Sequence, residues 1–545
     1  MKRLSFIKLF LILAILMLNI DYSYSCTNFL VSKGASVDGS VIITYNADAG
    51  GFMEPLYFRP PEDHKDGDSV DIYEWDSGRF LGKIAQVTHT YGVVGLMNEY
   101  QVSLGETTFG GRGELRDTAG KIDYGSLMFL GLQRAKTARE AIKVMTDLVA
   151  QYGYYSSGES FSVSDANEAW IMEMIGKGPG NKGAIWAARR VPDGYVCAHA
   201  NQARIREVPL DDPENCLYAS DIISFAEKKG FYDPNKGDFS FVDAYCPLNP
   251  GELLFCEGRV WSLFRRAAPS LNLSTDYWRA VKGAEPYPLF IKPDKKLSVQ
   301  DVISLMRDHF EGTEFDMTKD LAAGPFGCPY RWKNLTWKLE GDTITEYGWE
   351  RPISTQQTGF CFVSQSRGFL PREIGGVHWF GFDDNYSNIY VPLYCSMTRV
   401  PKSYQHGPMA EFDFGSAFWI YNLVANIAYT KYSYIIKDIQ AVQKEIEGKF
   451  RDYQPAIELA AMELYKKDSK LAVSYLTDYS NNQADITMER WFELWKQLVV
   501  KYNDGYINNV NKNRGRSPEG KGYGDKFLRM LTKERPGYYN VDWKK

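Results

Sequence analysis

The chain has 545 residues, and its 63 lysines and arginines nearly balance 68 aspartates and glutamates, which leaves a formal net charge of −5. This balance provides no basic face for nucleic acid and no basic tail for an acidic membrane. Beyond residue 25, no segment reaches the ~18 uninterrupted apolar residues of a membrane-spanning helix, so we expect neither a nucleic-acid partner nor a membrane span.

The first 25 residues have the organisation of a secretory signal peptide. A basic pair at positions 2 and 3 precedes an apolar run from 9 to 20, and Ser23 and Ser25 occupy the two small positions of a signal-peptidase site. Cleavage after Ser25 makes Cys26 the first residue of the mature protein. We therefore predict an exported protein, periplasmic or extracellular.

A cysteine at a new amino terminus carries its own general base. An α-amino group titrates near pH ~7.7–8.0 and a thiol near ~8.5, so the amine can take the thiol proton. Two other interpretations of Cys26 stay open, a lipid-modified anchor and an incidental cysteine. A lipoprotein signal usually has leucine three residues before the cysteine, where this chain has Ser23.

The first two strands are predicted over residues 28–32 and 41–45, joined by a loop that ends in the turn pair Asp38-Gly39. In an antiparallel hairpin the second strand returns to the start of the first, so Asn46 and Asp48 are expected beside Cys26. A carboxylate there can hold the α-amine. Alternatively, Asp48 caps the turn that follows it.

Further along, a helix is predicted from Thr137, which with Glu140 forms a capping box, to Gly153. Short alternating runs on both sides of it predict strands, and this mixture indicates an α+β fold. Beyond about residue 410 the pattern becomes helical, over 412–449, 454–467, 470–479 and 488–502, with no strand pattern and a loose stretch at 508–524. We expect a domain at 26–410 and a mostly helical segment at 411–545.

Several short motifs occur in a fixed order along residues 26 to 410. Together the motifs resemble the bacterial cysteine dipeptidases related to dipeptidase A and the secernins. They are Cys26-Thr27-Asn28-Phe29, Asp38-Gly39-Ser40, Asn46-Ala47-Asp48, Met97-Asn98-Glu99, Gly105-Glu106-Thr107-Thr108, and the run from Ala198 through His199 and Asn201 to Ile205.

The resemblance implies the four-layer αββα fold of the amino-terminal-nucleophile hydrolases, with the helical segment added at the end. It implies that Asp48 contacts the amine of the nucleophile and that Asn201 donates to the oxyanion. Thr107 falls near a second oxyanion position, and Arg266 near an arginine of the site. Bile-salt hydrolases of this superfamily carry arginine where this chain has Tyr45, which argues against an identical site.

The residue types fit these implied roles, and each has a plainer alternative. The Asn201 amide donates hydrogen bonds without carrying charge, which suits an oxyanion site, although asparagine also caps turns. Arg266 can grip a dipeptide carboxylate with two bonds or form a buried ion pair. His199 and Cys197 lie two residues apart on a strand, about ~6.5 Å, too far for a thiol–imidazole bond, so we expect His199 to be a supporting residue.

The sequence thus predicts an exported cysteine-nucleophile dipeptidase that acts on dipeptides without metal or organic cofactor. Its oligomeric state, including a homo-oligomer, is left open. One alternative keeps the fold but acts on N-acyl amides, as bile-salt hydrolases and penicillin acylases do. Another is a non-catalytic, lipid-anchored surface binding protein, which requires a lipid on Cys26.

Overall fold

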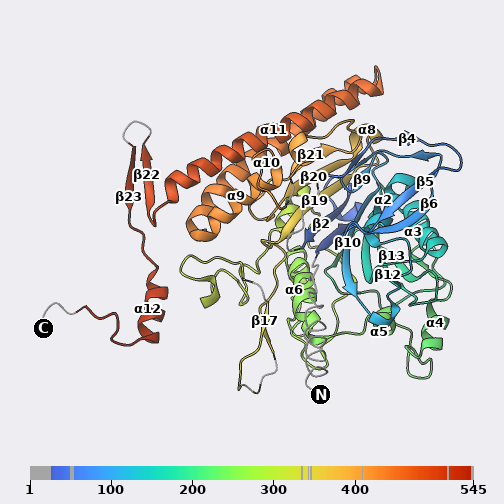
Figure 1. Cartoon of the computed structure of the whole chain (residues 1–545), viewed down its shortest axis with the longest axis horizontal. Helices are drawn as coiled ribbons and strands as arrows, with labels where there is room; N and C mark the ends of the chain where they lie inside the picture. Colours follow the sequence, from blue (N-terminus) through green and yellow to red (C-terminus); the bar gives the residue numbers. More distant parts are fainter. Residues whose placement is uncertain are drawn as a thin grey trace, which may run out of the picture.

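The computed structural model describes residues 26–49, 55–332, 335–341, 343, 346–407, 409–511 and 515–541. The predicted signal peptide, residues 1–25, lies outside the described residues. Figure 1 shows a body of sheets and helices from which a helical arm extends.

The first sheet has seven antiparallel strands and contains the chain segment that follows Cys26. Its central strands pair through Leu30 and Ile43, and through Val31 and Ile42, as the predicted hairpin requires. In spatial order the strands are β16 (Phe290–Ile291), β14 (Val196–His199), β1 (Asn28–Val31), β2 (Val41–Asp48), β19 (Thr358–Ser366), β20 (Val377–Phe382) and β21 (Val391–Tyr394).

The second sheet has eight strands and lies against the first. Its long strand β10 pairs with β11 along its length but with β9 only at Ser103. In order the strands are β15 (Cys216–Tyr218), β13 (Ala184–Arg190), β12 (Ala169–Gly176), β11 (Gly158–Ser164), β10 (Ser103–Gly110), β9 (Met97–Asn98), β8 (Val93–Val94) and β3 (Phe58–Arg59).

The two sheets approach closely at Gly105 of β10. A Cβ atom there would lie 3.0 Å from the Asn28 side chain and 3.2 Å from Cβ of Tyr45, so a larger residue would push the sheets apart. Helices α2 (Tyr124–Arg134) and α3 (Ala138–Tyr152) pack on the eight-stranded sheet, and α6 (Pro250–Ala267) and α7 (Val299–Met306) pack on the seven-stranded one. Because side chains of a strand alternate between faces, Thr44 contacts Met306 of α7 while Tyr45 faces the other sheet.

The remaining elements are short and lie at the margins of this body. They are β4 (Glu62–Asp63), β5 (Ser69–Tyr73), β6 (Phe80–Ala85), β7 (His89–Thr90), α4 (Ile222–Lys229), α5 (Phe241–Tyr245), β17 (Thr336–Trp337), β18 (Tyr347–Gly348) and α8 (Arg372–Gly375).

The predicted α+β class is confirmed, and so is the helix at 137–153. The side chain of Thr137 accepts from the backbone N–H of Glu140, α3 begins at Ala138, and Gly153 ends it with a φ of 80°. Left-handed backbone of this kind suits glycine because it has no Cβ.

The C-terminal segment differs from its prediction in two ways. Four helices were expected, but the structure has two helices of 34 residues, α10 (Tyr432–Tyr465) and α11 (Ser469–Tyr502), after α9 (Ala417–Thr430). Pro455 does not end α10, because packing of α10 along α11 outweighs the one backbone hydrogen bond that proline removes.

The second difference concerns the segment expected to be loose and without strands. Strands β22 (Ile507–Asn511) and β23 (Gly515–Glu519) form a hairpin, and α12 (Asp525–Glu534) follows. Helices α10 and α11 contact β21, which joins the arm to the seven-stranded sheet. The division into domains at residue 410 stays a prediction.

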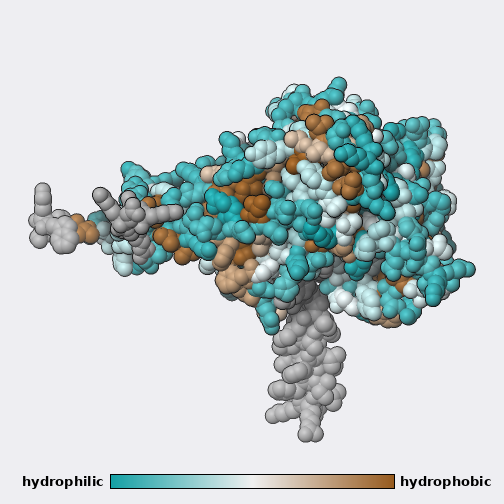
Figure 2. All heavy atoms as spheres, turned by 90° about the horizontal axis from the view of Figure 1, so that it is seen from above, coloured by the Kyte–Doolittle hydropathy of each residue, from teal (hydrophilic) through white to brown (hydrophobic). Residues whose placement is uncertain are grey.

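The surface seen in Figure 2 is mainly hydrophilic, with separate hydrophobic patches. None of the described helices combines the length and apolar character needed to cross a bilayer. Nor do the histidine, cysteine and acidic side chains of the described ranges form a group suited to a metal ion.

Candidate active site

Cys26 lies directly before β1 and is only 3% exposed. The next residue, Thr27, exchanges two backbone hydrogen bonds with Asn46, at 3.2 and 3.0 Å. Since the pairing is antiparallel, Asp48, two residues beyond Asn46, lies on the side of the Cys26 backbone nitrogen. The hairpin thus brings Asp48 next to the backbone nitrogen of Cys26.

The Asp48 carboxylate is fully buried and is held by two donors. Nη2 of Arg351 lies 3.0 Å from Oδ2, and the Thr358 hydroxyl donates to Oδ1 at 2.7 Å. A guanidinium and a hydroxyl both stabilise the charged form of a carboxylate. Asp48 is therefore positioned as an anion beside Cys26.

Arg259, in the middle of α6, connects Cys26 to the end of β14. Its Nη1 donates to the carbonyl oxygen of Cys26 at 2.5 Å and to the Thr27 hydroxyl at 2.8 Å. Its Nη2 donates to the carbonyl of Ala200 and to Oδ1 of Asn201, both at 3.0 Å. One buried guanidinium thus fixes Cys26 and Asn201 relative to each other.

Asn201 follows β14 in left-handed backbone, with a φ of 62°. Asparagine adopts this conformation more readily than most residues, which explains its place at this turn. Its Nδ2 donates to the carbonyl of Thr108 at 2.8 Å, while Arg259 holds its oxygen. The amide is therefore locked in one orientation close to Cys26.

Thr107 is buried between the sheets, where its hydroxyl lies 2.7 Å from Nδ1 of His199. The other ring nitrogen, Nε2, lies 2.8 Å from the Ser162 hydroxyl. Burial, followed by the nearby charge of Arg204, lowers the pKa of His199 to about 3. The imidazole is thus a neutral bridge between the sheets, which agrees with the supporting role expected for it.

The structure does not bring Arg266 to Cys26. Arg266 follows Arg259 by seven residues on α6, which is ~10.5 Å along a helix axis. Its guanidinium donates to the carbonyls of Ser304 and Leu305, at 2.8 and 3.1 Å, and lies 3.3 Å from Asp308. Arg266 thus forms the ion pair that was the alternative to a role in binding the substrate carboxylate. Residues seven apart share one helix face, and it is the earlier arginine, Arg259, that reaches the site.

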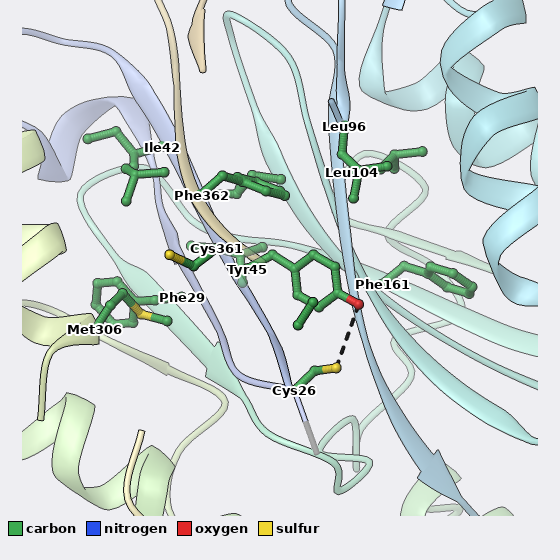
Figure 3. Close-up of a cluster of buried hydrophobic side chains, with 14 of the residues drawn as sticks. Cys26, Phe29, Ile42, Tyr45, Leu96, Leu104, Phe161, Met306, Cys361 and Phe362 are labelled. Carbon is green, nitrogen blue, oxygen red and sulfur yellow. Dashed lines mark hydrogen bonds between the residues drawn. The ribbon is translucent and has the colours of Figure 1, made fainter. Parts of the chain in front are cut away.

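Two side chains that sequence reasoning gave no role surround the Cys26 sulfur. Sγ lies 3.4 Å from Oε1 of Glu106 and 3.6 Å from the hydroxyl of Tyr45, and that hydroxyl donates to the same Oε1. Figure 3 shows Cys26 and Tyr45 pointing toward one another between the strands. Two features of the sequence could have indicated them: Glu106 belongs to one of the family motifs, and Tyr45 stands where bile-salt hydrolases carry arginine.

Burial raises the pKa of the Cys26 thiol well above its ordinary value, and the negative charges of Glu106 and Asp48 raise it further. The hydrogen bonds that Cys26 forms with the Tyr45 side chain and with the Asp48 backbone act in the opposite direction but are weaker. The thiol is consequently protonated at neutral pH. A nucleophile in this setting needs a base that removes its proton as it attacks.

The model of peptidase family C69 matches residues 25–69 and 71–445 of the chain, from the residue before Cys26 into α10. The chain belongs to peptidase family C69. The match includes every strand of the two large sheets and all the residues of the site described above.

Relatives of this C69 member are found in several bacteria. A probable dipeptidase of Salmonella dublin is 27% identical over 74% of this chain and 88% of its own length. A probable dipeptidase of Latilactobacillus sakei is 25% identical over 88% of this chain and 95% of its own. Dipeptidase A of Lactobacillus helveticus is 25% identical over 75% of this chain and 82% of its own length.

Proposed function

We propose that the chain is an exported dipeptidase whose nucleophile is Cys26, exposed as the amino-terminal residue when the signal peptide is removed. The observation that carries the proposal is the arrangement around Cys26, in which Arg259 holds its carbonyl and Asp48 lies beside its nitrogen. The C69 family match and the dipeptidase names of the relatives support the same activity. The paired sheets with helices on their outer sides suit the αββα fold of amino-terminal-nucleophile hydrolases.

In the proposed reaction, the Cys26 sulfur attacks the carbonyl carbon of the peptide bond while the α-amine takes the thiol proton. Asp48 orients the amine, and Arg351 and Thr358 keep Asp48 charged. The amine then protonates the departing amino acid, and the bond between carbon and nitrogen breaks. Water hydrolyses the remaining thioester and regenerates the thiol.

Asn201 is the proposed oxyanion donor because its amide is neutral and Arg259 fixes its orientation next to Cys26. The Thr107 hydroxyl is already bonded to His199. Its contribution to the oxyanion site stays a prediction, with a positioning role through His199 as the alternative.

The role first expected for Arg266, recognition of the substrate carboxylate, we transfer to Arg351. Nη2 of Arg351 pairs with Asp48, whereas Nη1 is buried and has no hydrogen-bond partner among the described residues. A buried N–H without a partner is costly unless a ligand accepts from it. The carboxylate of a dipeptide is such an acceptor, and no tripeptide presents one at the same distance from the bond cleaved.

A panel of substrates tests the proposed function. The mature protein should hydrolyse free dipeptides, and it should be much slower on tripeptides and on N-acyl amides, while Cys26→Ala should cleave none of them. Faster cleavage of acyl amides than of dipeptides would favour the acyl-amide hydrolase. A lipid on Cys26 together with no hydrolysis would favour the surface binding protein.

A further inference from the structure

A pair of buried carboxyl groups next to Cys26 has no role in the mechanism above. Glu106 on β10 and Glu159 on β11 are each 1% exposed. Oε1 of Glu106 accepts from Tyr45, and Oε1 of Glu159 accepts from the Thr108 hydroxyl at 2.9 Å. The second oxygen of each carboxyl, Oε2, receives no hydrogen bond from the described residues.

Among the described residues, the negative charge of this pair has no basic partner. In the part of the chain that the structure describes, no lysine, arginine or histidine pairs with Glu106 or Glu159. The two carboxyls lie within hydrogen-bonding distance of each other, and burial raises the pKa of both, more strongly for Glu159. A negative charge buried at this pair without a basic partner is costly.

The position of this charge matches one group of a dipeptide. Standard bond lengths and angles place the α-nitrogen of an amino acid ~2.5 Å from its own carbonyl carbon. The sulfur approaches that carbon to about 3–3.5 Å before attack, and Oε1 of Glu106 lies 3.4 Å from the sulfur. When the carbonyl of the first residue meets Cys26, its α-nitrogen can thus lie within bonding distance of Glu106.

We propose that Glu106 and Glu159 form the binding site for the free α-ammonium group of the substrate's first residue. The inference rests on the proposed function and deepens it, because an ammonium at this place distinguishes a dipeptide from an N-acyl amide. The ammonium supplies the positive charge that this pair of carboxyls lacks among the described residues. It also offsets the negative charge that opposes formation of the Cys26 thiolate.

A small apolar pocket lies near this site. Its wall residue Phe360 packs edge-on against Tyr45 with ring centres 5.5 Å apart, and Tyr45 bonds to Glu106. Another wall residue, Trp75, packs against Tyr124. These apolar walls favour an apolar first residue, and leucine is the probe.

The test compares leucyl-leucine with 4-methylpentanoyl-leucine, which has the same shape but lacks the ammonium. We expect the mature protein to prefer leucyl-leucine at least ~10³-fold in kcat/KM, because sites built around a polar group reject analogues that lack it. Glu106→Gln and Glu159→Gln should each reduce this preference at least ~10-fold. Glu173→Gln is the control and should leave the preference unchanged. Glu173 is a buried glutamate on β12 that accepts hydrogen bonds from the backbone N–H groups of Arg204 and Ile205.

Each outcome decides between the roles. Equal cleavage of the two substrates by the unmutated protein overturns the inference without any variant. If Glu106→Gln slows both substrates by the same factor, Glu106 acts on the Cys26 proton and not on the ammonium. If both variants cleave dipeptides with an unchanged preference, only this inference is contradicted. If the unmutated protein hydrolyses neither substrate, the proposed function is contradicted as well.

Discussion

Arg259 holds the carbonyl oxygen of Cys26 at 2.5 Å from the centre of a helix that begins at Pro250. The bond crosses 233 residues of sequence. It makes the orientation of Cys26 a property of the folded core, because the other terminal nitrogen of the same guanidinium is bonded to Ala200 and Asn201.

Two arginines on one helix provide a matched test of this relationship. Arg259→Lys should lower kcat at least ~10²-fold, since lysine cannot bond to Cys26 and Asn201 together. Arg266→Lys should change kcat less than ~3-fold, because Arg266 contacts Ser304 and Asp308. Steady-state kinetics with thermal unfolding of both variants checks this. The opposite order of effects would restore the site role to Arg266.

Replacement of the nucleophile should separate activity from stability. Cys26→Ala should lower the activity at least ~10³-fold, as loss of a catalytic nucleophile does in other hydrolases. Its near-ultraviolet circular dichroism should be the same as that of the unmutated protein. Cys328→Ala is the control, because Cys328 is the one cysteine of the eight that is not buried. Activity that survives in Cys26→Ala and is lost in Cys328→Ala would move the site.

The sequence predicted much of this arrangement where the contributing residues are close in the chain. The first hairpin follows from its turn pair and alternating strands, and it alone brings Asp48 to Cys26. Glu106 and Arg351 could not be found in that way. Glu106 reaches the sulfur across 80 residues, and Arg351 reaches Asp48 across 303, so only the packing of the two sheets and the later loops brings them together.

The C-terminal helices show a second limit of the sequence. The sequence pattern predicted a boundary between two helices before Pro455 and one continuous helix through Lys431, and both predictions were wrong. Long helices packed on each other tolerate a local defect, because tertiary contacts contribute more to their stability than intrinsic propensity does. The reversal at Lys431 is fixed by its ammonium, which donates to the carbonyls of Tyr502 and Tyr506.

His199 should affect stability with a defined pH dependence. Its pKa is about 3 in the folded protein and about 6.5 when unfolded, so between these values the unfolded chain binds a proton that the folded one does not. Its contribution to stability is therefore lost as pH falls, at about 1.4 kcal/mol per pH unit.

His199→Gln should be less stable than the unmutated protein by ~1–3 kcal/mol at pH 7.5, because it disturbs two buried hydrogen bonds. The difference should shrink by ~2 kcal/mol between pH 6.5 and 5, since glutamine does not titrate. Denaturant unfolding at both pH values measures it. A difference that grows on acidification would mean that the folded protein takes up a proton at His199.

Arg351 should determine the preference for a free substrate carboxylate. We expect the unmutated protein to cleave leucyl-leucine well and leucyl-leucine amide poorly, and Arg351→Lys to reduce this preference ~10-fold or more, because lysine cannot hold Asp48 and a carboxylate in the same planar geometry. The kcat/KM ratio of the two substrates is the measurement. A ratio that is near one before mutation would remove the carboxylate-binding role.

The free α-amine of Cys26 is the proposed base of the reaction. The most direct measurement compares two proteins, one beginning at Cys26 and one with a single alanine before it, each verified by intact mass and amino-terminal sequencing. We expect both proteins to fold with the same thermal stability and only the first to hydrolyse dipeptides, because an amide nitrogen cannot accept the thiol proton. Equal hydrolysis by the two proteins would contradict it.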